Sequence, residues 1–497
     1  MSSAPGTSTS PRVDLARSAA RGGGGTLLSQ ALRLVLQLGS VVVLARLLDP
    51  AAFGLVAMVT SIIGVAELVR DFGLSTAATR VKELDQDQQT NLFWTNTALG
   101  LGCSVVAAAL SPLVAAVYDR TELVPVVLAL SAVFTLNGVS TQFRVDLTRQ
   151  LRFGRLIVVD VAGQVAGIAV AITAAVLGAG LWALVAQQLT TAVVGCAGAA
   201  ALSGFRPGLP HRRSSVRPFL HFGGRLLATS SLWYATKNVD NVVLGVVAGP
   251  APLGVYARAY QLLMTPLNQL NAPLTRVAVP VLSAVQDDGP RYERYLRTAQ
   301  LTGCYVTAPV LAVAAALASP VVEVLLGREW HAVAPVFAAL AVGGVFRAVS
   351  QLAFWIYVSQ GRPGAQFRML LVTAPVMVAL MVAGSPWGAV GVAVGHSAAH
   401  FLYWAVSLWH VGRVTGVPVG PLFTTASRAV LVVSLPMAVV ASTATLLPIA
   451  AVLQIVAGVA LAVLYAVVAA LVLPWLRRDA VAVGELVRRA TGRARPA

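Results

Sequence analysis

Long apolar runs separated by short polar and basic loops dominate the pattern of this chain. A bilayer core takes about 20 apolar residues as one helix, and the runs predict an all-α protein with about fourteen spans. The predicted spans lie at 26–48, 53–72, 91–117, 122–143, 156–178, 181–202, 220–247, 254–283, 294–318, 332–359, 367–385, 387–410, 424–446 and 449–474.

The basic residues between these spans are distributed unequally across the membrane. Of the arginines and lysines, 25 fall in the tails and alternate loops of one side, counting Arg294, Arg297 and Arg368 in the first turns of their spans, and only Arg120 and Arg328 fall on the other. Loops rich in Lys and Arg stay in the cytoplasm. Both termini are therefore predicted to be cytoplasmic.

One phrase of the sequence occurs twice, 200 residues apart. Of 35 positions aligned without a gap, 11 are identical, including Pro50 with Pro250 and Gly54 with Gly254. Six spans precede the second copy, so both copies run in the same direction and predict two lobes related by a pseudo-twofold along the membrane normal. Membrane proteins built from two similar halves are most often transporters. The predicted segments are a cytoplasmic tail at 1–25, an N-lobe at 26–205, a cytoplasmic linker at 206–219, a C-lobe at 220–412, two further helices at 413–476 and a basic cytoplasmic tail at 477–497.

Composition excludes several other classes of protein. The 497 residues are 57% hydrophobic and 11% charged, whereas a soluble domain has about 25% charged residues. The net charge of +17 is spread through short loops, which indicates membrane topology rather than nucleic-acid binding. Neither lysine follows a glycine, so the chain has no Walker loop, and no cofactor is predicted. The short external loops leave no room for a polymerase or ligase domain.

Charged residues inside the spans are the candidate functional residues. Arg33, Lys237 and Arg347 lie near the middle of their spans, where each charge costs about 2.5–3.5 kcal/mol if it faces lipid. They are expected to face a watery interior or a counter-charge. The deep acids are chiefly Glu67 and Asp240, so the cations are not all paired. A cationic interior suits an anionic substrate, and guanidinium groups favour phosphate or diphosphate.

The span at 254–283 carries a polar stripe. Its members, which fall within about 140° of arc at helical spacing, are Arg258, Gln261, Thr265, Asn268, Asn271, Thr275 and Arg276. Pro266 and Pro273 are expected to break the backbone hydrogen bonding of this helix. The stripe predicts the lining of a cavity, with hydrogen bonding between helices as the alternative.

Two further pairs have helical spacing. Lys237 and Asp240 are three residues apart, which suits either a structural ion pair or a site of coupled protonation. Asp240 and Glu67 are the candidates for ion coupling. His396 and His400 share one helix face with no carboxylate or cysteine beside them, so no metal site is predicted.

The stretch from Leu253 to Thr298, "LGVYARAYQLLMTPLNQLNAPLTRVAVPVLSAVQDDGPRYERYLRT", resembles the polysaccharide exporters of the multidrug/oligosaccharidyl-lipid/polysaccharide superfamily, in particular the Wzx-type flippases for colanic and teichuronic acid. The phrase "LARLLDPAAFGLVAM" is similar to the first hairpin of that family. The resemblance implies two six-helix lobes, often with two further helices. It also implies movement of an undecaprenyl-diphosphate-linked oligosaccharide to the outer leaflet of the bacterial plasma membrane, with polysaccharide polymerase and assembly machinery as partners. Among the candidate cations, only Arg258 and Arg276 lie within the matched motif.

These observations predict a secondary transporter, not an enzyme, that flips a lipid-linked oligosaccharide by alternating access. The candidate substrate-binding residues are Arg33, Lys237, Arg258, Gln261, Asn268, Asn271, Arg276 and Arg347. A multidrug exporter of the same architecture is the alternative, although cationic drugs favour acids in the cavity. An envelope-synthesis enzyme lacks support because no ectodomain and no cluster of acid/base residues is found. A scaffold protein would not need deep charges.

Overall fold

The computed structural model describes residues 32–71, 85–210 and 238–479, and within these residues the secondary structure is helical, with no strand. Contacts between α-carbons divide the chain into two units. Of the described residues, unit 1 contains 32–47, 62–71 and 85–210, and unit 2 contains 48–61 and 238–479. Helix α2 (Pro50–Asp71) therefore begins in unit 2 and ends in unit 1.

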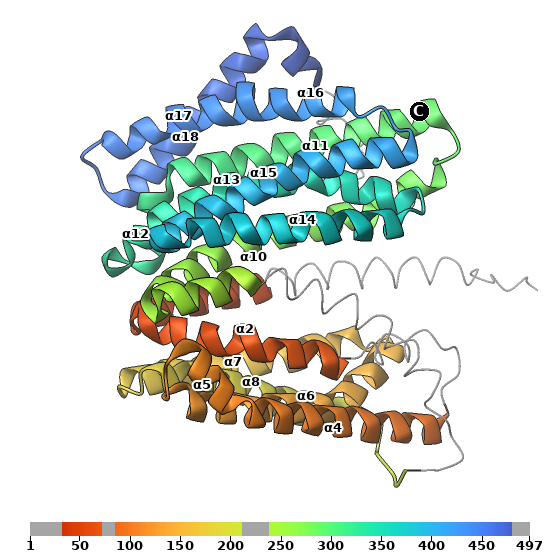
Figure 1. The fold of residues 1–497 in the computed structure, drawn as a ribbon, viewed down its shortest axis with the longest axis vertical. Helices are drawn as coiled ribbons and strands as arrows, with labels where there is room; N and C mark the ends of the chain where they lie inside the picture. Colours follow the sequence, from red (N-terminus) through yellow and green to blue (C-terminus); the bar gives the residue numbers. More distant parts are fainter. Residues whose placement is uncertain (1–31, 72–84, 211–237, 480–497) are drawn as a thin grey trace, which may run out of the picture. The chain divides into compact units, whose positions relative to one another are not determined.

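Unit 1 is a set of packed helices. They are Leu32–Ala45, α4 (Gln86–Ala109), α5 (Ser111–Tyr118), α6 (Leu123–Arg149), α7 (Phe153–Val176) and α8 (Leu181–Leu202). Helices α4 and α6 lie side by side, as do α7 and α8 (Figure 1). The Ser104 hydroxyl on α4 donates to the Ser131 carbonyl on α6 at 2.6 Å, which joins the first pair.

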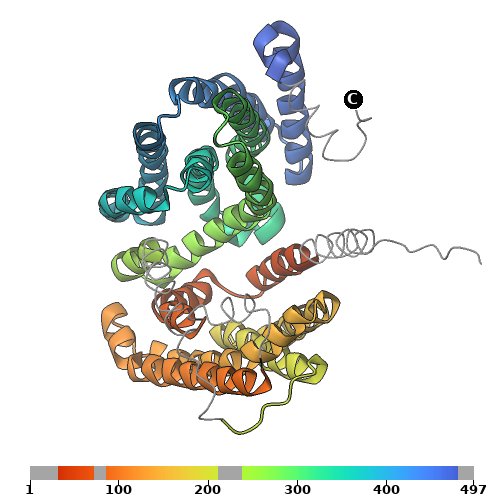
Figure 2. The same cartoon turned by 90° about the vertical axis from the view of Figure 1, so that its right-hand side faces the viewer.

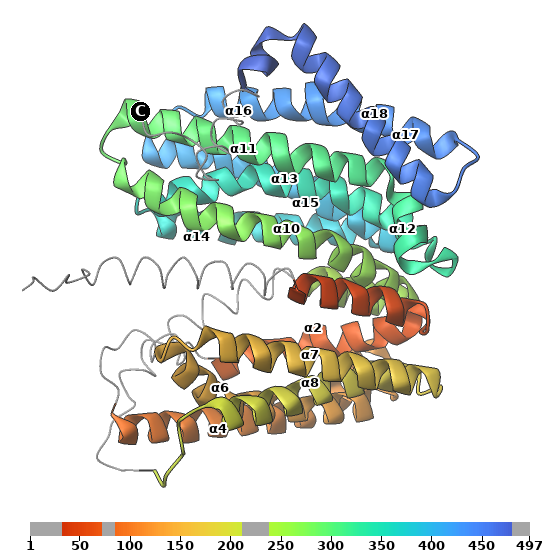
Figure 3. The same cartoon turned by 180° about the vertical axis from the view of Figure 1, so that it is seen from behind.

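Unit 2 contains the helix Asn238–Ala248 and the helices that follow it. These are α10 (Pro250–Ala284), α11 (Gly289–Ala316), α12 (Ala318–Leu326), α13 (Val333–Ser359), α14 (Pro363–Gly384), α15 (Gly388–Thr415), α16 (Gly420–Arg428), α17 (Leu435–Ser442) and α18 (Ala451–Val472). Short 3₁₀ turns cover Arg328–Trp330, Ser385–Trp387 and Thr443–Leu446, and a π-helical segment covers Ala429–Ser434. Helices α10 and α11 both pack against α13 (Figure 3), and the last helices, α17 and α18, pack beside α11 and α12 (Figure 2).

The two copies of the sequence repeat meet where α2 and α10 begin. Each helix starts at a proline, which suits the first position of a helix because its missing N–H has no partner there. A Cβ added at Gly54 would lie 1.8 Å from the Pro250 carbonyl oxygen, and one added at Gly254 would lie 1.8 Å from the Pro50 carbonyl oxygen. This reciprocal contact is the arrangement that a local twofold produces, and it requires glycine at both positions.

Substituting alanine for Gly54 or Gly254 is expected to lower stability by about 1–3 kcal/mol, because a methyl group would force the two backbones apart. The effect should be similar at both positions, since the contact is reciprocal. Thermal unfolding of the purified protein in detergent measures it. Gly303→Ala on α11 is the control, because no atom lies within 4 Å of a Cβ there. An unchanged melting temperature in both variants would contradict the close contact.

The helices have the length and composition of membrane spans. Within the described residues, nine helical segments meet both requirements, and one of them, Pro363–Thr415, contains both α14 and α15. Helix α18 exposes Val452, Val456, Val459 and Val463 along one face, as lipid contact requires. The class of a polytopic α-helical protein is thus confirmed, while the count of fourteen spans stays a prediction.

Two helices extend or continue in ways that the predicted spans did not specify. The fourth span was predicted to end at 143, and α6 continues as a helix to Arg149 and includes Arg144. Pro266 and Pro273 do not end α10, which runs as one helix from Pro250 to Ala284. The two prolines still lack the backbone N–H donors of other residues, so the carbonyls one turn earlier lose those hydrogen bonds.

Candidate functional site

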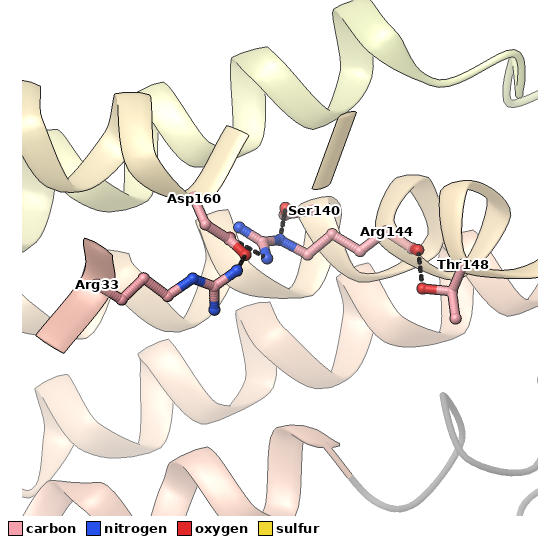
Figure 4. A network of polar contacts seen from close by, with 5 residues as sticks. All are labelled: Arg33, Ser140, Arg144, Thr148 and Asp160. Carbon is pink, nitrogen blue, oxygen red and sulfur yellow. Dashed lines mark hydrogen bonds and ion pairs between the residues drawn. The ribbon is translucent and has the colours of Figure 1, made fainter. Parts of the chain in front are cut away.

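In unit 1 two arginines share one aspartate (Figure 4). Nη2 of Arg33, on the helix Leu32–Ala45, donates to Oδ2 of Asp160 on α7. Nη1 of Arg144 on α6 donates to Oδ1 of the same carboxylate at 2.7 Å, and its Nε donates to the Ser140 hydroxyl at 3.2 Å. The helix Leu32–Ala45 and the consecutive helices α6 and α7 thus bring two guanidinium groups to one carboxylate.

The surrounding helices fix this arrangement. Gln187 on α8 donates to the Ser40 hydroxyl at 2.9 Å, which ties the helix of Arg33 to α8. A Cβ on Gly195 would lie 3.4 Å from Nη2 of Arg144, so the guanidinium group packs directly over that glycine. Both arginines therefore approach Asp160 from positions set by α6, α7 and α8.

The cluster keeps a surplus of positive charge. Two guanidinium groups offer ten N–H donors in total, whereas one carboxylate and one hydroxyl accept from them here. Nε of Arg33 is buried without a hydrogen-bond partner. The side chains of Arg33 and Arg144 are 42% and 39% exposed. An anion can therefore reach free donors on both arginines.

The sequence predicted Arg33 at this site but missed its two partners. Arg33 faces a counter-charge, one of the two environments expected for it. Arg144 was assigned to a loop on the cytoplasmic side, whereas the structure places it within α6, and its side of the membrane stays a prediction. Asp160 was overlooked, although an acid inside the span at 156–178 was the signal that could have identified it. Because Asp160 neutralises part of the charge, the net positive charge around Arg33 is smaller than the sequence indicated.

A second polar cluster lies in unit 2 around Asp240, which is only 2% exposed. The Tyr256 hydroxyl donates to Oδ2 of Asp240 at 2.6 Å, and the Asn241 backbone N–H donates to Oδ1 at 2.9 Å. Nδ1 of His396 lies 3.7 Å from the same Oδ2 and has no hydrogen-bond partner. The His396 ring stacks on the His400 ring with centroids 4.4 Å apart.

Arg347 on α13 supplies the positive charge of this cluster. A side-chain hydrogen bond joins it to Tyr260, and its charge acts on Asp240, His396 and His400. Its side chain is half-buried. The cluster thus combines one acid, one guanidinium group and two imidazoles from three helices, Asn238–Ala248, α13 and α15.

Two expectations for this region are affected. His396 and His400 were expected to have no carboxylate beside them, which is wrong because Asp240 lies next to His396. This contact joins residues 156 positions apart, so helical spacing could not reveal it. Across the part of the chain that the structure describes, no group of three or more His, Cys, Asp or Glu residues is arranged to hold a metal ion. Lys237, the expected partner of Asp240, lies outside the described residues.

Arg258 on α10 lies near the start of α2. Its guanidinium carbon is 4.4 Å from the centroid of the Phe53 ring, and Phe53 packs edge-on against Trp330 at 5.5 Å. A cation over an aromatic face is stabilised by the ring quadrupole. Nε of Arg258 has no hydrogen-bond partner. Arg258 thus has a cation–π contact and at least one free donor.

The polar stripe of α10 divides into two parts. Asn268 is exposed and Gln261 and Thr265 are half-buried, whereas the Thr275 hydroxyl accepts from Gln351 Nε2 at 3.3 Å and from Trp355 Nε1 at 3.0 Å. Thr275 therefore follows the alternative expectation, hydrogen bonding between helices. The side chains of Asn271, Arg276 and Glu67 lie outside the described residues.

Comparison with known proteins places the chain among bacterial polysaccharide proteins. Residues 43–335 match the family described as "polysaccharide biosynthesis protein". The chain is 28% identical over 372 residues to the lipopolysaccharide biosynthesis protein WzxC of Escherichia coli, covering 73% of this chain and 75% of that protein. It is 25% identical over 305 residues to the teichuronic acid biosynthesis protein TuaB of Bacillus subtilis, covering 61% and 63%.

The fold also has a solved counterpart. It is similar to the lipid II flippase MurJ in an inward closed conformation, with a TM-score of 0.66 over 90% of this chain and 98% of that one. The sequence identity of 12% limits this likeness to the fold. The predicted class of a helical transporter fold is confirmed.

Proposed function

The chain belongs to the polysaccharide biosynthesis protein family, and on that premise we propose that it flips a lipid-linked oligosaccharide across the bacterial plasma membrane for export of a cell-surface polysaccharide. Family membership confirms the resemblance seen in the sequence. The protein is a multi-pass membrane transporter and not an enzyme. The finer parts of the proposal are the diphosphate-linked substrate, both termini in the cytoplasm and assembly with a polysaccharide polymerase.

The observation that carries this proposal is the pair of partly exposed guanidinium groups of Arg33 and Arg144 within a bundle of apolar helices. Charge inside a membrane span is costly and marks a functional site by default. Guanidinium groups bind phosphate oxygens through two parallel N–H bonds, so two of them suit a diphosphate. The proposed substrate carries this diphosphate whatever the composition of its sugars.

The remaining site residues extend the proposal. Arg347 and Arg258 are proposed as further contacts for the anionic head group, together with Gln261 and Asn268 on α10. Lys237, Asn271 and Arg276 were assigned the same role from the sequence. Asp240, now together with His396, is proposed as the ion-coupling site, with Glu67 as a second candidate. Alternating access exposes these groups first to one side of the membrane and then to the other.

A vesicle assay tests the proposed function. Purified protein is reconstituted with a prenyl-diphosphate oligosaccharide that carries a fluorophore quenched by membrane-impermeant dithionite. Wild-type protein is expected to move this lipid from the inner to the outer leaflet, where dithionite quenches it. The double variant Arg33→Gln with Arg144→Gln is expected to leave the inner pool protected from dithionite. Ethidium in the same vesicles tests the multidrug alternative. Transport of ethidium without movement of the diphosphate lipid would replace the proposal with that alternative.

A further inference from the structure

We propose that Asp160 is an internal substitute for a phosphate group, which occupies Arg33 and Arg144 in the substrate-free protein and keeps the membrane's own phosphodiester lipids from binding them. The inference rests on the proposed function, because it concerns the arginines assigned to the substrate's diphosphate. It adds that an acid, and not only the two cations, determines which lipids enter the site.

The carboxylate divides its oxygens between guanidinium groups of two different helices (Figure 4). Oδ2 accepts from Arg33 and Oδ1 accepts from Arg144 at 2.7 Å. Carboxylate and phosphate are bound by guanidinium through the same planar set of N–H donors. Asp160 therefore takes positions in which phosphoryl oxygens of a ligand can bind.

The arginines are more accessible than the aspartate between them. The exposed fractions are 42% for Arg33 and 39% for Arg144, but only 19% for Asp160. A lipid head group can thus reach the guanidinium groups while the carboxylate stays largely covered. Nε of Arg33, buried without a partner, is a donor that Asp160 leaves unused.

Anionic lipids of the bilayer compete with the substrate for the two arginines, and Asp160 opposes that competition. Anionic phospholipids such as phosphatidylglycerol carry one phosphodiester charge and surround the protein in large excess. Two unopposed arginines would bind them through charge alone. Asp160 halves the net charge of the arginine pair from +2 to +1 and competes at a fixed, high effective concentration because α7 holds it in place.

A diphosphate diester can still displace the carboxylate. It carries two negative charges and spans both guanidinium groups, whereas a phosphodiester brings one charge. Asp160 therefore lowers the binding affinity of every anion. Only the affinity of a phosphodiester falls below the level needed to occupy the site. Selectivity gained by opposing the wrong ligand is a general device of specific binding sites.

Asp160→Asn tests the inference, because it removes the charge and keeps the size of the side chain. Native mass spectrometry of the full-length protein in detergent measures binding of phosphatidylglycerol and, separately, of a prenyl-diphosphate sugar. Phosphatidylglycerol affinity is expected to rise by at least about tenfold, since an opposing charge at contact distance, discounted for partial exposure, has an effect of that order. Vesicles with the variant should also flip fluorescent phosphatidylglycerol, and vesicles with the wild type should not.

Glu122→Gln is the matched control. Glu122 accepts from Arg120 at 3.1 Å, so it is also an acid paired with an arginine in unit 1. It precedes α6, and its 22 residues from Arg144 correspond to about 33 Å along a helix. This substitution is expected to leave phosphatidylglycerol binding unchanged.

Repulsion between the two arginines could unfold Asp160→Asn, so the test is repeated with Arg33→Gln present. In that background only Arg144 remains, and adding Asp160→Asn should still raise phosphatidylglycerol affinity. Unchanged phosphatidylglycerol affinity in both backgrounds would overturn the inference and make Asp160 a structural residue. If the wild type does not bind the prenyl-diphosphate sugar, the proposed function is contradicted. The phosphatidylglycerol measurements are independent of that result, so the two failures can be told apart.

Discussion

Replacing Arg347 with glutamine is expected to lower transport at least about tenfold, while the amount of protein in the membrane stays near the wild-type level. A hydrogen bond to a charged group is worth about 1.5–3 kcal/mol, and about 1.4 kcal/mol corresponds to a tenfold change in rate. Loss of one such hydrogen bond to the substrate's phosphate is therefore sufficient for a tenfold decrease in transport. Glutamine can keep the hydrogen bond to Tyr260, so folding should tolerate the change.

The same result is expected for Arg33→Gln, since Asp160 would remain paired with Arg144. The vesicle assay measures transport, and immunoblotting of membranes measures abundance. Arg368→Gln, at an exposed arginine near the start of α14, is the control and should transport normally. Normal transport by both test variants would show that neither cation contacts the substrate.

The sequence predicts the fold well because two strong signals act together. Apolar runs of about 20 residues specify spans, and the repeat specifies how the halves correspond. The repeat also identifies Gly54 and Gly254, which meet in the reciprocal contact between α2 and α10. Helix ends are less predictable, because an apolar run does not show where a helix leaves the bilayer. Helix α6 continues past the expected end of its span for that reason.

The candidate site is predicted only in part. Depth in the membrane identifies Arg33, Arg347 and Asp240, since an intramembrane charge is visible in the sequence itself. Their partners depend on which helix faces pack together, and helical spacing contains no information about that. Asp160 lies 127 residues from Arg33, and His396 lies far from Asp240 in the chain. The sequence therefore gives the charged groups but not the pairs that they form.

Asp240 is placed to exchange a proton with its neighbours. Tyr256 donates to its carboxylate, and Nδ1 of His396, 3.7 Å away, has no hydrogen-bond partner. One added proton could be shared between these two groups, because each has an atom that can bind a proton and the two atoms lie 3.7 Å apart. In the described residues, the titratable or charged groups that act on Asp240 are Tyr256 and Tyr260 on α10, Arg347 on α13 and His396 on α15, and His400 stacks on His396.

Asp240→Asn is therefore expected to make transport independent of the proton gradient while membrane abundance persists. The asparagine oxygen can accept from the Asn241 N–H while its NH2 group donates to the Tyr256 hydroxyl, so both buried contacts can be kept. Transport in vesicles is compared with and without an imposed pH difference, and His396→Gln is expected to reduce the same dependence. Asp479→Asn is the control, because Asp479 also accepts from a tyrosine, Tyr305 at 3.1 Å, in the same unit. That variant should keep the wild-type response.

A different result would assign Asp240 to a structural pair with Lys237. In that case Asp240→Asn lowers the abundance of the protein, and adding Lys237→Gln restores both abundance and transport, because a neutral pair avoids the cost of a stranded buried charge. Full activity of Asp240→Asn with an unchanged response to the gradient would exclude both roles.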